Sequence, residues 1–402
     1  MFNLTQFIST YVTKRPTSMF LPDIENNRAA LTERIQNKTV LVIGGAGSIG
    51  SSFIKAILPF KPKTLVVVDT NENALAELTR DLRSTKGMYV PGDYIPYPMD
   101  FASPVFEKMF IKRGGFDIVG NFSAHKHVRS EKDIYSVEAL LQNNVLHAKL
   151  LLDLLAKYPP EEYFCVSTDK AANPVNIMGA SKRIMEDVIF SYSDKFPVKT
   201  ARFANVAFSN GSLPAGFLAR IQKLQPLSGP SDVKRYFVSP EESGQICMLA
   251  CMLGNSREIF FPKLEEAQMM TFDAIGIELL HEYGYEVLHC NSDEEAIDKA
   301  EDLKNGSKYY PVHFTVSDTS GEKPFEEFVT DTETADMERL TSLGVITGKE
   351  IPNQERVKKL FVDLNAAFDK EETTKEEVVK IMKDYLPNFE HIETGKSLDS
   401  KM

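Results

Sequence analysis

TVLVIGGAGSIG, residues 39–50, is the stretch of sequence that decides the fold. Its first half is short, apolar and rich in β-branched residues, which predicts a buried strand, and the apolar spacing from Ile49 to Leu58 predicts a helix. A second apolar run, TLVVV at 64–68, ends on Asp69. A strand, a helix and a strand in this order form a βαβ unit, which requires a parallel sheet.

Three glycines, Gly44, Gly47 and Gly50, lie between the first predicted strand and its helix. Glycine permits a tight turn and a close approach of the backbone to a ligand, and the helix N-terminus offers free N–H groups to a pyrophosphate. Asp69 follows about 20 residues later, where a carboxylate accepts hydrogen bonds from a ribose 2′-OH. The pattern predicts bound NAD, because a carboxylate repels the 2′-phosphate of NADP. Arg80 and nearby polar residues leave NADP possible.

Strands and helices continue to alternate as far as residue 210, which predicts an α/β fold with a Rossmann-type doubly wound parallel sheet. This regular alternation of strands and helices ends there, so we expect a smaller C-terminal substrate-binding α/β part. The predicted divisions are a helical lead-in at 1–37, an NAD(P)-binding Rossmann domain at 38–210, a substrate-binding part at 211–330 interleaved with it, and an acidic helical extension at 331–402. The predicted elements include strands at 117–122, 163–167 and 199–203 and helices at 137–155, 181–192, 241–253, 271–282, 357–368 and 378–385.

Composition and charge exclude several classes of function. The chain has 402 residues and a formal net charge of −11, which disfavours a broad surface for nucleic acid or anionic membranes. No stretch reaches the roughly 18 apolar residues that a membrane span needs, and we identify no signal peptide. The four cysteines form no C-x-x-C pair, so we predict no metal site and a reducing, cytoplasmic location. Cys247 and Cys251 lie four apart in an apolar helical pattern and are expected in the core.

The segment most informative about chemistry is VSTDKAANPVNIMGASK at 166–182. A predicted strand ends at Ser167 and places Thr168, Asp169 and Lys170 at the carboxyl edge of the sheet, where open α/β sheets bind ligands. Adjacent acidic and basic side chains can move two protons at one edge of a substrate. A surface ion pair at the end of a strand is the alternative interpretation.

This segment resembles the nucleotide-sugar 4,6-dehydratases of the extended short-chain dehydrogenase/reductase superfamily, especially the UDP-N-acetylglucosamine 4,6-dehydratases of the polysaccharide-biosynthesis and bacillosamine-pathway type. Further segments match the same group, so the resemblance covers roughly residues 24–330. They are GGAGSIGS at 44–51, SAHKHV at 123–128 with Asn144–Val145, RFANV at 202–206, KRYFVSPEES at 234–243 and SGEKPFEEF at 320–328.

The resemblance implies a three-step reaction on a nucleotide-linked sugar. A hydride passes from sugar C4 to NAD⁺, water is eliminated across C5 and C6, and the hydride returns to C6. In the family pattern Asp169 is the acid that helps the C6 hydroxyl to leave, and Lys170 is the base that takes the C5 proton. Thr168 is expected to hydrogen-bond near O4, and Lys182 is expected to hold the nicotinamide ribose.

Met178 departs from the superfamily pattern Tyr-x-x-x-Lys, in which the tyrosine is the base for the oxidised hydroxyl. A thioether cannot carry a proton at any useful pH. Either the chain is a non-catalytic nucleotide-binding relative, or it is similar to a Met-bearing branch in which Asp169 takes the O4 proton. That branch is associated with retention at C5, so a retained configuration is expected. A nucleotide-sugar 4-epimerase is a further alternative, although the Asp169–Lys170 pair and the missing tyrosine speak against it.

The resemblance adds further contacts to the predicted site. Cofactor contacts are expected from Ser48, Ile49, Asp100, Ala124 and Lys126, and substrate contacts from Lys126, His127, Asn205, Arg235 and Glu322. Structural alternatives are a helix cap for Asp100, a hydrogen-bonding role for His127, and solvated charges for Arg235 and Glu322. The family often dimerises through two long helices per subunit, here 137–155 and 181–192, so a homodimer or higher homo-oligomer is expected.

Overall fold

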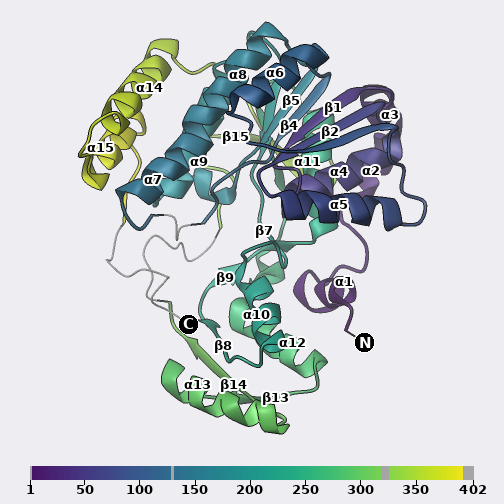
Figure 1. Cartoon of the computed structure of the whole chain (residues 1–402), viewed down its shortest axis with the longest axis vertical. Helices are drawn as coiled ribbons and strands as arrows, with labels where there is room; N and C mark the ends of the chain where they lie inside the picture. Colours follow the sequence, from purple (N-terminus) through teal and green to yellow (C-terminus); the bar gives the residue numbers. More distant parts are fainter. Residues whose placement is uncertain (1, 128–130, 318–325, 393–402) are drawn as a thin grey trace.

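The computed structural model describes residues 2–127, 131–317 and 326–392, and within them the largest element is a nine-stranded sheet (Figure 1). Its order is β15-β16-β11-β6-β5-β4-β1-β2-β3; β16 runs antiparallel to both of its neighbours, β15 and β11, and the other neighbouring pairs are parallel. The strands are β1 (Thr39–Ile43), β2 (Thr64–Asp69), β3 (Asp93–Pro98), β4 (Ile118–Asn121), β5 (Glu162–Val166), β6 (Val198–Ala201), β11 (Glu258–Pro262), β15 (Thr334–Asp336) and β16 (Leu343–Thr347). The order of the first six strands is that of the Rossmann fold, which confirms the predicted doubly wound class.

The side chains of β1 show how this sheet is covered. Val40 and Val42 face one layer of helices, Leu41 and Ile43 face the other, and all four are buried. The first layer contains α3 (Arg28–Ile35), α4 (Ser48–Ile57), α5 (Glu72–Ser84) and α11 (Pro240–Leu253). The second layer contains α6 (Pro104–Arg113), α7 (Ile134–Leu141), α8 (His147–Lys157) and α9 (Ile177–Phe190). Because both faces are buried, the carboxyl edge of the sheet is the place for polar chemistry.

A smaller lobe lies below the large sheet in Figure 1 and has a core of its own. Its three-stranded parallel sheet is flanked by helices, with β8 (Leu227–Pro230), β14 (Tyr309–Thr315), β13 (Glu286–His289), α10 (Leu213–Gln222), α12 (Phe272–Glu282) and α13 (Asp293–Ala300). The first helical turns, α1 (Leu4–Phe7) and the π-helical η1 (Ile8–Val12), pack into this core, whereas α2 (Leu21–Asn26) packs with α3 on the large sheet. The predicted lead-in is therefore helical but divided between the two lobes.

Short strand pairs and 3₁₀ turns complete the described part of the chain. The two-stranded pairs are β7 (Asn205–Val206) with β10 (Phe237–Val238), and β9 (Lys234–Arg235) with β12 (Met270–Thr271). The 3₁₀ turns are η2 (Leu58–Phe60), η5 (Asp169–Ala171), η6 (Glu266–Gln268) and η7 (Glu301–Asn305). These elements matter for function because η5, β7 and β9 carry predicted site residues.

Three strands join the large sheet from outside the segment predicted as the Rossmann domain. β11 comes from the predicted substrate-binding part, and β15 and β16 come from the predicted helical extension. The sequence signal for β16 is weak because the strand has only five residues, LGVIT, and one is a glycine. The ring of Phe261 packs onto Gly344, where a Cβ would lie 2.2 Å from Phe261 Cζ. One edge of the sheet is thus made by segments that are remote in sequence from the strands they extend.

The last described helices, α14 (Gln354–Phe368) and α15 (Lys375–Tyr385), confirm the two helices predicted near the C-terminus. They lie along the outer side of α7, α8 and α9 (Figure 1). The ammonium of Lys149 lies 5.6 Å from the centre of the Phe361 ring, and Tyr385 Oη donates to Asp187 Oδ2 at 3.4 Å. They therefore occupy the face on which the family resemblance predicts a second subunit, and the oligomeric state stays a prediction.

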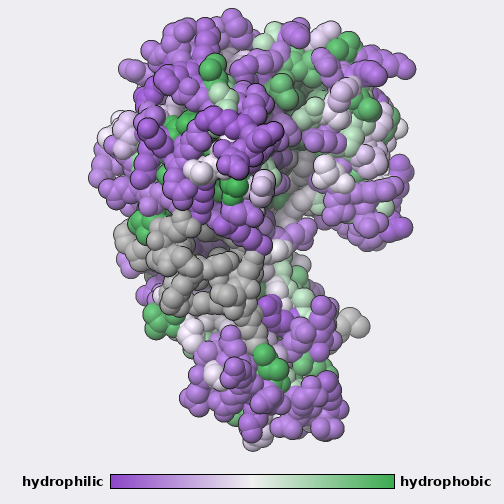
Figure 2. Space-filling model, turned by 60° about the vertical axis from the view of Figure 1, so that its left-hand side comes forward, coloured by the Kyte–Doolittle hydropathy of each residue, from purple (hydrophilic) through white to green (hydrophobic). Residues whose placement is uncertain are grey.

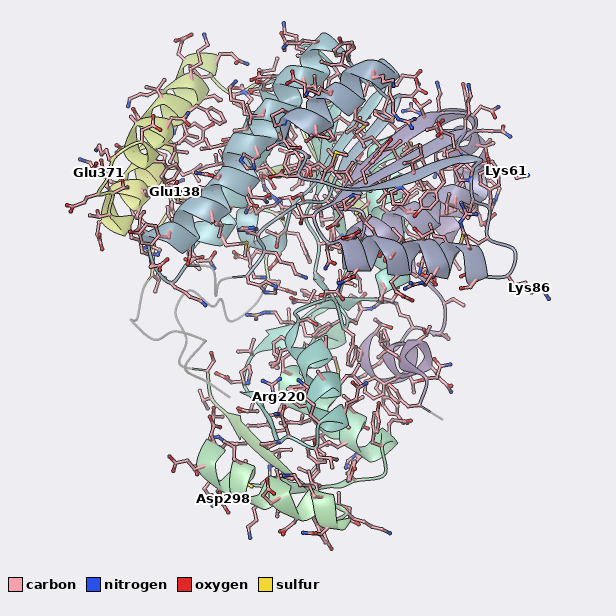
Figure 3. All side chains as sticks on the ribbon, viewed as in Figure 1. Lys61, Lys86, Glu138, Arg220, Asp298 and Glu371 are labelled. Atoms are coloured by element: carbon pink, nitrogen blue, oxygen red, sulfur yellow. The ribbon has the colours of Figure 1, made fainter. Side chains whose placement is uncertain are left out.

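The surface is polar over both lobes. Charged side chains such as Lys61, Lys86 and Asp298 point away from the body of the molecule (Figure 3). On the face in Figure 2, hydrophobic residues are scattered among hydrophilic ones, and the described residues form no extended hydrophobic patch there.

Candidate active site

The glycine turn after β1 forms a cradle of backbone at the N-terminus of α4. Gly44 has φ +70°, and a Cβ there would lie 2.6 Å from Ser123 N, just after β4. At Gly50, in the first turn of α4, a Cβ would lie 2.4 Å from Gly44 O. Gly47 is the N-cap of α4 and leaves the helix N-terminus without a covering side chain. The turn fits the predicted dinucleotide, because it presents backbone N–H groups where a diphosphate would bind.

Asp69 ends β2 beside this turn, as the sequence predicts. Its Oδ2 accepts a hydrogen bond from Ala46 N at 3.0 Å, and its Oδ1 accepts one from Asn71 N at 2.9 Å. Carboxylate oxygens accept more than one hydrogen bond each, so a ribose hydroxyl can still bind here. Ser48 begins α4, and its Oγ accepts from Asn210 N at 2.9 Å, which ties the turn to the segment that leads into the smaller lobe.

Three other predicted cofactor residues lie around the carboxyl edge of the sheet. Ile49 in α4 and Ala124 after β4 are half-buried. Asp100 follows β3 and is exposed, and its Oδ1 accepts from Ala102 N at 2.8 Å while its carbonyl accepts from Ser103 Oγ at 2.6 Å. Asp100 therefore makes a local turn before α6, but Ser103 is the N-cap of that helix, so the alternative of a helix cap is wrong and the cofactor contact stays a prediction.

A π-helical segment, η4 (Gln142–Leu146), continues α7 into α8 and holds the loop after β4. Asn144 Oδ1 accepts from His125 N at 2.9 Å, and Asn144 Nδ2 donates to His125 O and to Ser181 Oγ, both at 3.0 Å. Asn143 Oδ1 accepts from Ser123 Oγ at 3.2 Å. Such π segments occur frequently at functional sites. This one links the loop that touches the glycine turn to α9.

Lys126 and His127 follow in the same loop, and both residues are exposed to solvent. Atoms around the Lys126 ammonium nevertheless displace enough water to lower its pKa by desolvation. The imidazole of His127 packs on Gly211, where a Cβ would lie 2.9 Å from His127 Nε2. The loop therefore reaches from β4 to the start of the smaller lobe, and the predicted contacts of both residues with ligands stay predictions.

Thr168, Asp169 and Lys170 lie together at the carboxyl end of β5. Thr168 Oγ1 donates to Asp169 Oδ1 at 2.7 Å, and Lys170 Nζ donates to both carboxylate oxygens at 3.3 Å. Asp169 is buried, while the side chain of Lys170 is 29% exposed. A solvated ion pair would leave both groups in water, so the burial of Asp169 speaks against that alternative.

Met178 is buried in the first turn of α9. Its N–H donates to Glu131 Oε1 at 2.9 Å, and the N–H of Ile177 donates to Glu131 Oε2 at 3.1 Å. The Glu131 carboxylate thus satisfies the free N–H groups at this helix N-terminus. The Met178 thioether cannot carry a proton.

Lys182 is buried one turn further along α9. Burial lowers the pKa of this ammonium, although nearby Cys165 and Glu186 raise it. The ammonium donates to Met185 Sδ at 3.1 Å. An ammonium has three donors and a thioether is a weak acceptor, so ribose hydroxyls would complete the hydrogen bonding of Lys182. In this respect the residue fits the predicted nicotinamide ribose.

Asn205, at the start of β7, binds a residue to which the sequence analysis assigns no role. Its Nδ2 donates to Glu326 Oε1 at 2.6 Å, and Tyr236 N donates to Glu326 Oε2 at 2.8 Å. Glu326 is buried, and burial together with the charge of Asp169 raises its pKa to about 8. This carboxyl therefore binds Asn205, a predicted substrate residue, and lies within the electrostatic influence of Asp169 and Lys170.

Arg235 lies on β9 and is buried rather than solvated, which overturns the alternative of a solvated loop arginine. Its Nη1 donates to Lys234 O at 2.8 Å. Glu322 and its neighbour Lys323 lie outside the described residues. The contact of Glu322 with substrate stays a prediction.

Arg202, from the RFANV segment, lies at the centre of a buried ion network and is fully buried itself. It pairs with Glu186 of α9 at 2.9 and 2.7 Å and with Glu333 at 2.7 and 2.9 Å, and it donates to Phe328 O at 2.9 Å. Burial raises the pKa of Glu333, but Arg202 outweighs this effect and the pKa falls to about 2. The network fastens residues 326–333 to α9 and to the end of β6.

Sequence reasoning missed the roles of Glu326, Arg202 and Asn144. All three lie in segments that carry the family resemblance, SGEKPFEEF, RFANV and Asn144–Val145, and this was the signal that could have found them. Spacing along the chain could not, because Glu326 binds Asn205 across 121 residues and Arg202 binds Glu333 across 131.

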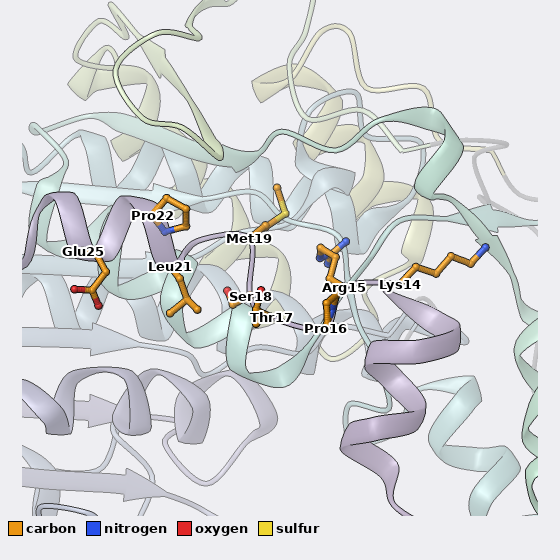
Figure 4. A pocket seen from close by; sticks show the side chains of 9 residues that line it. All are labelled: Lys14, Arg15, Pro16, Thr17, Ser18, Met19, Leu21, Pro22 and Glu25. Carbon is orange, nitrogen blue, oxygen red and sulfur yellow. The ribbon is translucent and has the colours of Figure 1, made fainter.

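A surface hollow of about 610 Å³ lies along the N-terminal arm rather than at this site (Figure 4). Its lining comes from residues 14–25. The guanidinium of Arg15 is already bound, because it donates to both carboxylate oxygens of Glu242 at 2.7 and 2.6 Å and to Phe237 O at 3.0 Å. The predicted site residues do not line this hollow, so we do not regard it as the active site.

Comparison with known proteins gives a consistent family. A profile of the family described as "Polysaccharide biosynthesis protein" matches residues 40–347. The uncharacterized membrane protein MJ1061 of Methanocaldococcus jannaschii is 30% identical over 359 residues, which cover 87% of this chain and 96% of that protein. EpsC of Bacillus subtilis, a probable polysaccharide biosynthesis protein, is 30% identical over 68% of this chain, which spans 44% of EpsC. Among the described residues, no helix has both the length and the apolar character that crossing a membrane requires.

Two enzyme names occur among further relatives. A UDP-N-acetylglucosamine 4,6-dehydratase (inverting) of Campylobacter jejuni is 25% identical over 56% of this chain and 67% of that protein. A UDP-glucose 4-epimerase of Rickettsia conorii is 29% identical over 72% of this chain and 87% of that protein. The crystal structure of Pen from Bacillus thuringiensis superposes with a TM-score of 0.62 at 20% identity, over 82% of this chain and 98% of Pen. At that identity the structural similarity establishes the fold alone.

Proposed function

The chain belongs to the polysaccharide biosynthesis protein family, and on this basis we propose that it is an NAD(P)-dependent nucleotide-sugar 4,6-dehydratase. The observation that carries the proposal is the hydrogen-bonded set of Thr168, Asp169 and Lys170 at the carboxyl end of β5. This set offers an acid and a base, which water elimination next to an oxidised carbon requires. The proposed substrate is UDP-N-acetylglucosamine, in line with the name of the Campylobacter relative, and the product is the UDP-2-acetamido-2,6-dideoxy-4-hexulose.

The proposed cofactor is NAD. When bound, it accepts a hydride from sugar C4 and later gives that hydride to C6. Gly44, Gly47 and the N-terminus of α4 would hold its diphosphate, Asp69 its adenosine ribose and Lys182 its nicotinamide ribose. NAD is favoured over NADP because a 2′-phosphate would lie against the carboxylate of Asp69.

Asp169 and Lys170 would divide the proton transfers between them. Lys170 takes the C5 proton and returns it to C5 when the hydride reaches C6. Asp169 takes the O4 proton, because Met178 cannot, and gives it to the C6 hydroxyl as that group leaves. Thr168 fixes the direction of the Asp169 carboxylate through its 2.7 Å hydrogen bond. Lys170 delivers its proton to the face from which it took it, so the configuration at C5 is retained.

The nucleotide part of the substrate would lie toward the smaller lobe. Arg235 and Asn205 lie there on β9 and β7, close to the carboxyl of Glu326. A guanidinium forms paired hydrogen bonds with phosphate oxygens, which suits Arg235 to a diphosphate. Lys126, on the loop after β4, would approach the sugar from the cofactor side.

A nucleotide-sugar 4-epimerase is the second candidate, since the Rickettsia relative carries that name. Epimerisation requires oxidation at C4 and reduction from the other face, without a proton transfer at C5. An epimerase reaction would not use Lys170 as a base. It would also need the tyrosine of the superfamily pattern, where this chain has Met178. The geometry therefore favours dehydration.

The proposal is tested by incubating the purified protein with UDP-N-acetylglucosamine and NAD⁺ and following the sugar by NMR. A 4-keto-6-deoxy product with the original configuration at C5 supports the proposal. A C4 epimer supports the second candidate. No turnover of UDP-, GDP- or dTDP-linked sugars would contradict an enzymatic role.

Replacing the proposed C5 base separates chemistry from cofactor binding. Lys170→Ala is expected to lower the dehydratase kcat by about 10²–10⁴-fold, the usual contribution of a general base. NAD⁺ affinity should stay unchanged, because Lys170 lies on η5 and not on the glycine turn. Lys195→Ala is the matched control, since Lys195 is exposed and pairs with Asp194 at 2.9 Å. Full dehydratase activity in Lys170→Ala would show that Lys170 is not the base.

A further inference from the structure

The C-terminal segment, residues 375–392, reaches the catalytic segment 166–182 from the outer side of the molecule. It consists of α15, which lies along α9 in Figure 1, and the described chain that follows α15. Beyond α15, Phe389 is buried in the core, and Ile392 N donates to Val175 O at 3.1 Å. Val175 lies between η5, which carries Asp169 and Lys170, and the start of α9. The segment therefore binds the backbone next to the proposed catalytic residues.

Glu131, just before α7, is the residue at which the C-terminal segment meets α9. Its carboxylate accepts from Ile177 N at 3.1 Å and from Met178 N at 2.9 Å. Its backbone carbonyl accepts from Lys375 Nζ at 2.9 Å, and its Oε2 lies 3.9 Å from His391 Nε2. The side chains of Glu131 and His391 are only 9% and 12% exposed. Two side chains of the C-terminal segment thus hold the residue that binds the first N–H groups of α9.

The first turn of α9 is coupled to the position of Glu131. The first N–H groups of a helix have no partners within the helix, and a carboxylate placed there is favoured by hydrogen bonding and by the helix dipole. Ile177 and Met178 are buried. If Glu131 moved away, their N–H groups would lose a partner in a place with little water, which is costly. The first turn of α9 is therefore expected to follow Glu131 when it moves.

The same turn of α9 supports the backbone of η5. A Cβ at Gly179 would lie 2.6 Å from Lys170 O, so η5 packs directly against α9 at this glycine. Gly179 N donates to Oδ1 of Asn176, the N-cap of α9, at 2.7 Å. A shift of the first turn of α9 would therefore displace Lys170, the proposed C5 base.

These contacts form a continuous path from the C-terminal segment to the proposed catalytic residues. We propose that residues 375–392 are a positioning element that acts through Glu131 and the first turn of α9 on Lys170. The effect on catalysis rests on the proposed dehydratase function, whereas the effect on α9 does not. A catalytic group misplaced by about 1 Å can cost roughly 100-fold in rate, so even a smaller displacement is measurable.

The decisive variant is Lys375→Met/His391→Ala, which removes both side chains from Glu131 in the full-length chain. Its kcat for dehydration is expected to fall by about 10-fold, while KM for the nucleotide sugar stays within about 2-fold. KM should change little because the proposed nucleotide contacts, Asn205 and Arg235, lie on β7 and β9. The conservative variant Lys375→Arg/His391→Gln keeps a donor at each position and should recover most of the lost kcat.

Two controls separate this effect from a general loss of stability. Lys380→Met/His289→Ala makes the same two changes at exposed residues, one of them on α15, and should behave like the natural protein. Val357→Ala, at a buried position of α14, should lower the melting temperature but leave kcat unchanged well below that temperature. An equal loss of kcat in either control would overturn the inference.

Hydrogen exchange tests the contact without depending on activity. Deuterium uptake is measured by mass spectrometry in a peptide that covers residues 175–180. The N–H groups of Ile177 and Met178 are bound to Glu131, so the Lys375→Met/His391→Ala variant should exchange them about 10-fold faster than the natural protein. Unchanged uptake overturns the inference. Faster uptake with full kcat also overturns it, because the first turn of α9 would then be loosened without consequence for catalysis.

The natural protein, assayed in parallel, separates the two proposals. If it forms no dehydrated sugar, the proposed function fails together with the catalytic effect, while deuterium uptake still decides whether the C-terminal segment holds α9. If it forms the product and the Lys375→Met/His391→Ala variant forms it equally fast, only the positioning role is refuted.

Discussion

The glycine turn and the group formed by Asn205, Arg202 and Glu326 are built in different ways; we call this group the substrate edge, because the proposed function places the nucleotide sugar there. At the glycine turn the decisive contact, Asp69 with Ala46 N, joins residues only 23 apart within one βαβ unit. At the substrate edge Asn205 meets Glu326 across 121 residues, and Arg202 meets Glu333 across 131. The first half is shaped by backbone, whereas the second depends on buried charges brought together by the whole fold.

This difference teaches where each half is vulnerable. A backbone turn fails when a side chain occupies space that only glycine leaves free. A buried ion network fails when one partner is removed, because the remaining charge stays in a poorly hydrated place. Three substitutions, ordered from the largest expected effect to the smallest, test whether the two halves behave in these separate ways.

Arg202→Met should break the substrate edge most severely. It leaves Glu186 and Glu333 buried without their main partner, and we expect a loss of about 3–5 kcal/mol in the free energy of unfolding. Chemical denaturation measures this loss. Arg80→Met is the control, because Arg80 pairs with Glu77 on the exposed side of α5 and should cost no more than about 1 kcal/mol. Equal costs for the two variants would refute the importance of the buried network.

Gly44→Ala should break the cofactor half. The new Cβ would lie 2.6 Å from Ser123 N in a backbone conformation with φ +70°, and we expect a cost of roughly 1–3 kcal/mol together with loss of NAD⁺ binding. Titration calorimetry with NAD⁺ and a thermal melt measure the two effects. Gly87→Ala has a similar φ of +81° with no atom within 4 Å of the added Cβ, so it should cost stability alone. Unchanged NAD⁺ affinity in Gly44→Ala would contradict the cradle.

Asp69→Asn is expected to have the smallest effect of the three substitutions, and it acts on cofactor selection. The substitution keeps the shape of the side chain but removes the negative charge of the carboxylate. That carboxylate accepts a hydrogen bond from Ala46 N and is proposed to bind the ribose. We expect NAD⁺ affinity to fall by about 10-fold, or ~1.4 kcal/mol, and the preference for NAD⁺ over NADP⁺ to shrink. Asp81→Asn, at a surface ion pair with Lys55, is the control for the loss of one charge. An unchanged preference would remove Asp69 from cofactor selection.

Much of the cofactor half could be predicted from the sequence. The strand at 39–43, the glycine turn, the helix from Ser48 and the acid at Asp69 lie where local patterns place them. Helices α14 and α15 were also predicted, because apolar residues recur at helical spacing in them. In each case the information is contained in a window of about 10–30 residues, the scale on which periodicity works.

The substrate half could be predicted only in part. Thr168, Asp169, Lys170 and Asn205 were predicted as site residues and stay predictions, whereas the contact of Asn205 with the buried carboxyl of Glu326 was not predicted. β15 and β16 were missed because short strands at a sheet edge obtain their stability from β11, a partner that no local pattern reveals. The helix α9 begins at Ile177, before the predicted residue 181, because Asn176 is its N-cap and accepts from Gly179 N at 2.7 Å, while the Glu131 carboxylate accepts from the N–H groups of Ile177 and Met178.

Because Asp69 and Glu326 lie far apart along the chain, the ribosome synthesises Asp69 well before Glu326. A ribosome adds about 5–20 residues per second, so the roughly 250 residues between them take on the order of 10–50 s to synthesise. During that interval the emerging chain already contains the strands and the helix of its glycine turn. Glu326, which binds Asn205, is still to be translated, so in each new molecule the glycine turn is complete before the contacts around Asn205 can form.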